Sequence, residues 1–246
     1  MPAVPTPTRR RRTEPLRCTG CERGADCLGA ALDEGSAAGR MSRSGLERGD
    51  HLYRMGEPSD SLYVVSGGAF KSYVVTPDGG EQVLGFVLPG DVLGIDSLTH
   101  PHFQSSAVAI APARVCRMPA EAIRLRIGES PDFRERLTAR MGREIQRLQR
   151  LLHLGRCTAE QRVAVFLLNQ SAQTEGAGLA GRAQRLPMSR RDIGQFLGLA
   201  TETVSRVFTR LQDSGALRCR RTSIEIRNIE RLMEIARVGL PLRRGG

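Results

Sequence analysis

The sequence predicts an α+β protein in which an antiparallel β-structure is followed by one long helix and then by a small helical unit with a hairpin. Three observations support this prediction. Short apolar runs separated by turn residues extend from residue 49 to residue 118, an apolar stripe of helical period covers residues 131–154, and shorter amphipathic patterns fill the rest of the chain. At 246 residues the chain is long enough to bury a hydrophobic core without disulfides.

The segment before residue 49 has the weakest pattern. Residues 1–17 are rich in proline, threonine and arginine, which predicts a disordered tail. Residues 18–48 hold three cysteines followed by a linker rich in glycine and alanine. In the domain 49–129, glycines recur every 7 to 12 residues between short apolar runs, as far as residue 90. This spacing predicts a compact antiparallel barrel or sandwich that ends near Met118.

A long helix is predicted over residues 130–155. Ser130, Pro131 and Asp132 have the features of a helix start, with a capping side chain, a proline at the first helical position and an acid in the first turn. Beyond them, apolar residues at helical spacing form a seam for a partner helix. The members of this dimer seam are Leu137, Met141, Ile145, Leu148 and Leu152. We expect a homodimer; the alternative is that the seam packs against the chain's own core.

Residues 156–246 predict a DNA-binding unit. Ser189, with Asp192 three residues later, has the pattern of a helix-capping box, and Gly198 permits a tight turn after the first short helix. The arrangement is typical of a helix-turn-helix with residues 201–213 as its recognition helix. A stretch of alternating apolar and polar residues over 217–226 follows and predicts a hairpin wing.

The outward face of the recognition helix carries side chains suited to reading bases. Glu202, Ser205 and Arg206 stand at helical positions i, i+3 and i+4. Glu202 can accept a hydrogen bond from the cytosine amino group, and Arg206 can donate two bonds to guanine. Ser205 can donate or accept a hydrogen bond, or contact a thymine methyl. We also expect Thr201 and Arg190 to contact DNA. Residues 180–246 carry a formal charge of +8 out of +11 for the whole chain, which favours a polyanionic partner.

The cysteines predict a metal or redox site. Cys18, Cys21 and Cys27 form a C-x2-C-x5-C pattern, and Cys116 lies on a predicted strand, so that three thiolates on a loop and a distant fourth can bind either a four-iron cluster or a zinc ion. The spacing leaves both open, together with a purely structural role. The chain has no apolar stretch of membrane-spanning length and no secretory signal, so we expect a cytoplasmic protein with reduced thiols.

Enzymatic activity is not expected. The four histidines do not show the spacing of a metal site, and the sequence has neither a nucleophile motif nor a glycine loop that binds phosphate.

The order of barrel, long helix, helix-turn-helix and wing resembles the cyclic-AMP receptor protein superfamily. The cysteine pattern, together with the spacing of Glu202, Ser205 and Arg206, resembles its oxygen-sensing branch, the fumarate and nitrate reduction regulators. The similarity covers nearly the whole chain from Cys18 onward. It implies that the barrel is an antiparallel β-roll, a jelly roll of the cyclic-nucleotide-binding type, and that the C-terminal unit is a winged helix-turn-helix. Supporting stretches are Ser61-Leu-Tyr, Ser66-Gly, Lys71-Ser-Tyr, Gly79 to Gln82, Gly85-Phe86, Val115-Cys116 and residues 190–206.

The resemblance implies one [4Fe–4S] cluster per subunit on Cys18, Cys21, Cys27 and Cys116, which favours the dimer when oxygen is scarce. The dimer would bind TTGAT-like inverted repeats and control genes for anaerobic or low-oxygen metabolism. Arg206 would contact the guanine, Glu202 the paired cytosine and Ser205 a thymine. The resemblance further implies a contact with RNA polymerase through a turn whose residues include Thr76, Asp78, Gly79 and Gly80.

Three features depart from the family pattern. The segment after Cys27 is short, Glu22 and Asp26 place carboxylates beside the ligating cysteines, and Arg147 and Arg150 lie near positions that control repulsion between the paired helices.

Two alternatives belong to the same superfamily. A cyclic-AMP sensor needs an arginine on the barrel for the phosphate, and no arginine lies between Arg54 and Arg114, which argues against cyclic AMP as the ligand. The other alternative is a zinc-clamped or cluster-less regulator that binds DNA constitutively.

Overall fold

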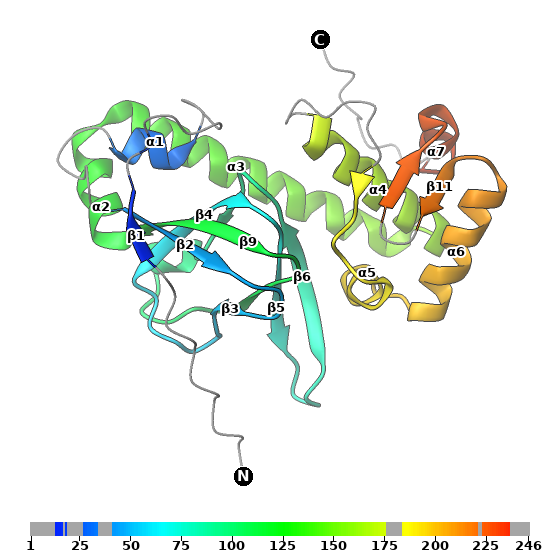
Figure 1. Cartoon of the computed structure of the whole chain (residues 1–246), viewed down its shortest axis with the longest axis horizontal. Coiled ribbons are helices and arrows are strands. Elements are labelled where there is room, and N and C mark those ends of the chain that lie inside the picture. The colour runs from blue at the N-terminus through cyan, green and yellow to red at the C-terminus, as the bar shows by residue number, and fades with distance from the viewer. Residues whose placement is uncertain are drawn as a thin grey trace. The chain divides into compact units, whose positions relative to one another are not determined.

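The computed structural model describes residues 13–16, 18, 27–33, 41–175, 184–220 and 223–236. The chain divides into two compact units, residues 1–142 and residues 143–246, and each is described by itself. Figure 1 shows the strands of the first unit and the helices of the second. None of the helices in the described segments combines the length and apolar character needed to cross a membrane.

The first unit is an antiparallel β-roll made of two sheets (Figure 1). One sheet has the order β1-β2-β9-β4-β7, and the other has the order β3-β8-β5-β6. The strands of the first sheet are β1 (Thr13–Pro15), β2 (Ser42–Leu46), β9 (Ala113–Pro119), β4 (Ser61–Gly67) and β7 (Val92–Leu93). Those of the second are β3 (His51–Tyr53), β8 (Ser106–Ala109), β5 (Phe70–Val75) and β6 (Glu81–Val87). The expected antiparallel roll is confirmed, with β9 ending one residue beyond Met118.

Two separate apolar cores stabilise this unit. The roll interior is filled by aromatic and aliphatic side chains, among which Tyr53 stacks on Phe103 with ring centroids 3.9 Å apart. The second core, which we call the outer core, lies on the other face of the β9 sheet. It collects side chains from helix α1 (Leu28–Asp33), helix α2 (Ala120–Glu129) and the start of helix α3 (Pro131–His153). A short 3-10 helix, η2 (Ile95–Leu98), completes the unit.

Helix α3 begins where the sequence predicts it. The backbone N–H of Phe133 donates to the Ser130 side chain over 3.2 Å, which is the expected N-terminal cap. Phe133 and Leu137 are buried in the outer core, so the first two turns of α3 belong to the packing of the roll.

The second unit contains the helix-turn-helix and its wing. Its helices are η3 (Leu154–Arg156), α4 (Ala159–Glu175), α5 (Arg190–Leu197), α6 (Thr201–Asp213) and α7 (Ile229–Ala236). Its three-stranded sheet has the order β10 (Gln184–Arg185), β12 (Ser223–Ile226) and β11 (Leu217–Arg220). The predicted recognition helix and wing hairpin are confirmed at these bounds, while β10 and α7 were not expected from the sequence.

The structure differs from the sequence-based expectation before residue 49. Thr13–Pro15, expected in a disordered tail, forms a strand that pairs with β2, and β2 pairs in turn with β9. The roll therefore starts at Ser42 or earlier rather than at Gly49. Leu28–Asp33, expected in a weakly patterned linker, is helical, with Leu28 and Leu32 buried in the outer core. Both elements are short and owe their order to tertiary partners rather than to local pattern. Residues 1–12 lie outside the described segments.

Candidate functional site

Cys18 and Cys27 lie at the two ends of one small structural unit around α1. The backbone N–H of Cys18 donates to Asp33 Oδ2, in the last residue of α1, over 2.7 Å. The carbonyl of Cys27 accepts from the N–H groups of Ala30 and Ala31 at the first turn of the helix. Asp33 thus fixes the backbone at Cys18, and the helix start fixes the backbone at Cys27.

The sulfurs of these two cysteines converge above a glycine. A Cβ atom added at Gly29 would lie 3.6 Å from Cys18 Sγ and 3.6 Å from Cys27 Sγ, with Met41 Sδ at 3.7 Å. Any side chain at position 29 would enter the space between the two thiols. The glycine therefore leaves a small cradle that is bounded by sulfur.

Cys116 lies on the same face of the sheet. It is buried on β9 between Arg43 of β2 and Val64 of β4, which are its direct partners in the two neighbouring strands. Burial raises the pKa of the Cys116 thiol, and the adjacent Arg43 guanidinium opposes this rise. Cys27 raises the same pKa slightly, and both Cys18 and Cys27 pack against the apolar core that contains Cys116.

These donors fit an iron–sulfur cluster. Cys18, Cys27 and Cys116 are all free thiols, and all three belong to or pack against the outer core. Thiolate is the ligand type that such clusters require, and the Gly29 cradle keeps side-chain atoms out of the space beside two of the sulfurs. Within the described residues, no group of three or more His, Cys, Asp or Glu side chains is arranged for a single metal ion. Cys21, the fourth predicted ligand, and the carboxylates of Glu22 and Asp26 lie outside the described segments.

The dimer seam of α3 divides into a buried and an exposed part. Leu137 is buried in the outer core of its own subunit, so its side chain is used within the chain. The other four members remain exposed in the single chain: Met141 44%, Ile145 55%, Leu148 46% and Leu152 81%. An apolar face of this kind on one helix is unusual for a surface in water and is typical of an interface.

The recognition helix α6 presents the predicted reading face. Val204, Val207, Phe208 and Leu211 are buried, whereas Thr201, Glu202, Ser205 and Arg206 are exposed on the opposite side. The Ser205 hydroxyl donates to the backbone carbonyl of Thr201 over 3.0 Å. Glu202 and Arg206 form no ion pair with each other within the described part of the chain, so both head groups face solvent.

Helix α5 holds α6 in place through tight backbone packing. Ser189 and Asp192 form the predicted capping box, and Gly198 ends α5 in the left-handed conformation with φ +65°. A Cβ atom at Gly194 would lie only 2.5 Å from the carbonyl oxygen of Leu199, so this helix position requires glycine.

Arg190 occupies a different position from the other predicted DNA contacts. Its guanidinium carbon lies 3.3 Å from the centre of the Phe208 ring, and its Nη2 lies 3.9 Å from Cys219 Sγ in the wing. Burial lowers the pKa of Arg190. The side chain thus connects α5, α6 and the wing, and its predicted DNA contact stays a prediction.

The predicted polymerase-contacting turn is an exposed hairpin loop between β5 and β6. The N–H of Thr76 donates to the Gly80 carbonyl and the N–H of Gly79 donates to the Thr76 carbonyl, each over 2.8 Å. Gly79 has φ +80°, and Asp78 accepts hydrogen bonds from the Thr76 hydroxyl and the Gly80 N–H, which lower its pKa. The loop is ordered by its own polar contacts, and its contact with RNA polymerase stays a prediction.

Comparison with protein families gives two matches in the order seen in the fold. A cyclic nucleotide-binding domain matches residues 44–127, and a Crp-like helix-turn-helix domain matches residues 161–235.

Individual relatives agree with this assignment. The transcriptional activator protein Anr of Pseudomonas aeruginosa is 39% identical over 188 residues, which are 76% of this chain and 75% of that protein. The fumarate and nitrate reduction regulatory protein of Escherichia coli K12 is 37% identical over 192 residues, 78% of this chain and 77% of that protein. The structure of FixK2 from Bradyrhizobium japonicum has a TM-score of 0.74 at 33% identity and covers 81% of this chain and 99% of that one.

Both sequence relatives are named as regulators rather than enzymes, in agreement with the absence of a catalytic motif. The chain belongs to the CRP/FNR superfamily of DNA-binding transcription regulators, in the branch of the fumarate and nitrate reduction regulators.

Proposed function

We propose that this protein is an oxygen-responsive transcription regulator that binds one [4Fe–4S] cluster per subunit, dimerizes when the cluster is intact and binds TTGAT-like inverted repeats. The observation that carries the proposal is the composition of the outer core. Cys116 is a buried member of this core, as are Phe133 and Leu137 of α3. Cys18 and Cys27 pack against it. The candidate ligands and the dimerization helix therefore share one packed core.

In this proposal Cys18, Cys21, Cys27 and Cys116 hold the cluster. The cluster supplies the reaction with oxygen when it is bound. The chain's own residues supply the rest: Asp33 fixes the backbone of Cys18, and Leu28 and Leu32 of α1 anchor the cysteine loop in the outer core. Loss of the thiolate ligation would release the loop from this core, which changes the packing beneath the start of α3.

The exposed seam of α3 provides the dimer interface. Met141, Ile145, Leu148 and Leu152 recur at steps of three and four residues, so that two copies of the helix bury four apolar side chains each. Each subunit then presents one α6 helix to a half-site, in which Arg206 contacts guanine, Glu202 cytosine and Ser205 a thymine. Two-fold symmetry of the dimer requires an inverted repeat.

The further partners follow from the same proposal. The loop of Thr76, Asp78, Gly79 and Gly80 contacts RNA polymerase, and the protein works in the cytoplasm, where its thiols remain reduced. Cyclic AMP is not the proposed signal. The stacked rings of Tyr53, Tyr63 and Phe103 belong to the roll core, and the Gly94 N–H donates to the Tyr53 hydroxyl just before η2. Residues 55–113 of the roll contain no arginine for a phosphate.

The test is to purify the protein without oxygen and to measure its iron, sulfide, zinc and visible absorbance. Binding to a TTGAT-N4-ATCAA duplex is then followed before and after air is admitted. About four irons per chain, bleaching in air and a parallel loss of DNA binding support the proposal. A colourless protein with one zinc per chain and equal DNA binding in both states contradicts it and identifies a zinc-clamped regulator.

A matched pair of variants separates ligands from other thiols. Cys116→Ala is expected to abolish cluster loading, whereas Cys219→Ala, at a half-buried wing position, is expected to load iron like the wild type.

A further inference from the structure

One buried polar atom beside the candidate ligands lacks a hydrogen-bond partner within the part of the chain that the structure describes. Arg43 stands directly opposite Cys116 in the β2–β9 ladder. Its Nε atom is buried and makes no hydrogen bond to any group of the described residues. A buried guanidinium N–H without a partner costs free energy, about 1–3 kcal/mol for a typical buried donor, so such groups are retained where something else accepts the bond.

The surroundings of Arg43 indicate what accepts this bond. The side chain lies next to the Cys116 thiol, and the nearby outer core is apolar, with Met41 and Leu16 among its buried members. No carboxylate is paired with Arg43 among the ion pairs of the described residues. Among the described residues, the positive charge therefore has no carboxylate partner, and Arg43 stands opposite Cys116 in the sheet.

We propose that Arg43 is the positioning residue that donates to the ligated Cys116 sulfur and neutralises part of the negative charge of the bound iron–sulfur cluster. This inference rests on the proposed function. A cluster held by four thiolates is an anion, and its potential depends on nearby charge, on hydrogen bonds to sulfur and on solvent access. The guanidinium supplies the nearby positive charge and the hydrogen bond to sulfur. It thereby stabilises the reduced, more negative state of the cluster against loss of an electron to dioxygen.

The sequence places further negative charge beside the candidate ligands. Glu22 and Asp26 add negative charge close in sequence to the ligands, and Asp33 accepts from the Cys18 backbone. Added negative charge favours the oxidised state of a cluster. A fixed cation on the opposite strand counteracts that effect.

The experiment compares Arg43→Gln and Arg43→Lys with the wild type in the full-length protein loaded without oxygen. The control is Arg117→Gln, because Arg117 is adjacent to Cys116 in sequence but lies on the other face of the strand, where it pairs with Asp60 over 2.9 Å. The readouts are iron and sulfide per chain, the rate at which the cluster absorbance decays in air, and the reduction potential. A thermal unfolding curve of each variant shows whether it is folded.

We expect Arg43→Gln to decay roughly three- to tenfold faster in air and to have a more negative reduction potential, since a charged hydrogen bond to the sulfur is lost. Arg43→Lys keeps the charge, so its decay rate and reduction potential should lie between those of the wild type and Arg43→Gln. Arg117→Gln should behave like the wild type. If the wild type loads about four irons and both Arg43 variants match its decay rate and potential, the inference fails while the proposed function stands. If the wild type binds no iron and sulfide, the proposed function fails and the inference fails with it.

Discussion

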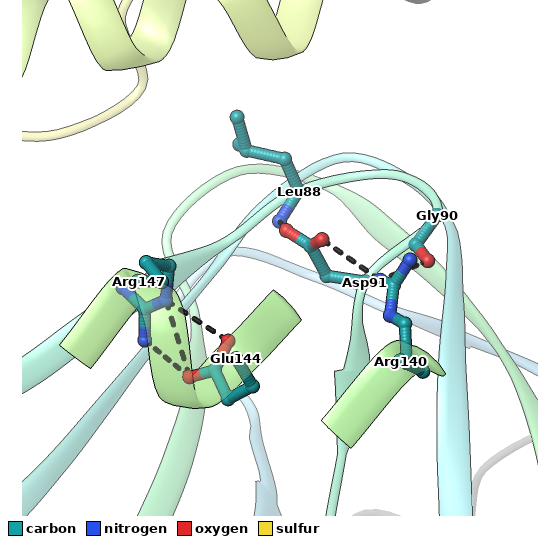
Figure 2. Close-up of polar contacts among 6 residues, drawn as sticks. All are labelled: Leu88, Gly90, Asp91, Arg140, Glu144 and Arg147. Atoms are coloured by element: carbon teal, nitrogen blue, oxygen red, sulfur yellow. Dashed lines mark hydrogen bonds and ion pairs between the residues drawn. The ribbon is translucent and has the colours of Figure 1, made fainter. Parts of the chain in front are cut away.

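Arg140 in α3 and Asp91 in the turn before β7 form an ion pair with 2.9 Å between Nη2 and Oδ1 (Figure 2). The same Nη2 also donates to the Gly90 carbonyl. The second carboxylate oxygen of Asp91 accepts from the N–H of Leu88, so the turn is closed on itself and then bonded to the helix. This clasp fixes α3 against the roll one residue before the exposed seam begins at Met141.

The first prediction concerns this clasp. Arg140→Gln removes the charge that bonds α3 to the turn and should weaken the dimer by about 1 kcal/mol, or about fivefold in its dissociation constant, because the pair is only partly buried. Analytical ultracentrifugation of the anaerobic protein measures the change. The control is Arg136→Gln, since Arg136 pairs with Asp132 within α3 itself. Equal dimer dissociation constants for both variants would show that the Arg140–Asp91 ion pair does not position the seam.

The second prediction concerns the seam. Ile145→Asp places a charge in the centre of the proposed interface and should convert the protein to a monomer, with loss of binding to the inverted repeat. Leu125→Asp is the matched control because Leu125 of α2 is 44% exposed and lies off the seam. Size-exclusion chromatography with light scattering measures both. An Ile145→Asp protein that remains a dimer would place the interface elsewhere.

Arg147, beside the proposed dimer seam, is paired within its own helix. In the sequence, Arg147 lies near positions that control repulsion between paired helices in the family. In the structure its guanidinium is bonded to Glu144 of the same helix, with 2.6 Å between Nη2 and Oε1 (Figure 2). The pair carries no net charge, so Arg147 adds less repulsion than a lone arginine would. The side chain of Arg150 lies outside the described part of the structure.

The third prediction tests the packing of the helix-turn-helix. Gly194→Ala forces a methyl group against the Leu199 carbonyl and should destabilise the DNA-binding unit by about 1–3 kcal/mol, with a parallel loss of DNA affinity. Gly128→Ala is the control, because a Cβ atom there meets nothing within 4 Å and the change should stabilise α2 slightly. Urea unfolding and DNA titration measure the two effects. Wild-type DNA affinity in Gly194→Ala would mean that the two helices can separate without cost.

The helix-turn-helix was predictable from the sequence because its signals are local. Capping residues, glycines at turns and the apolar period of α6 lie within a few residues of one another, and the structure matches them. The contacts around Cys116 were not predictable in this way. Arg43 is separated from Cys116 by most of the roll, and only the strand register brings them together. Similarly, no local pattern indicates that Arg140 bonds to Asp91 or that Leu137 is used inside its own subunit.

The fourth prediction concerns pH. Burial, followed by the nearby Arg54, lowers the pKa of His51 below its usual value of 6.5, and His51 Nε2 hydrogen-bonds the Tyr73 hydroxyl over 2.8 Å. The folded state binds this proton less well than the unfolded state does. His51 therefore leaves the free energy of unfolding unchanged at high pH and decreases it as the pH falls below about 6.5. His51→Gln should remove part of this loss. Urea midpoints between pH 7.5 and 5.5 measure it, with His100→Gln at an exposed position as the control. Parallel pH profiles for wild type and His51→Gln would exclude His51 as the source.

The fifth prediction concerns base reading. Arg206 is exposed on α6 and free to form two bonds with guanine, so Arg206→Ala should reduce affinity for a TTGAT half-site by about 1–3 kcal/mol and relax the preference for guanine at that position. Arg210→Ala, one turn further from the N-terminus of α6, is the matched control. It removes an exposed charge from the same helix and should weaken binding about equally for all sequences. Titration of each variant against duplexes with each base at the guanine position measures the difference. If Arg206→Ala weakens every duplex by the same factor, Arg206 contacts the phosphate backbone rather than the base.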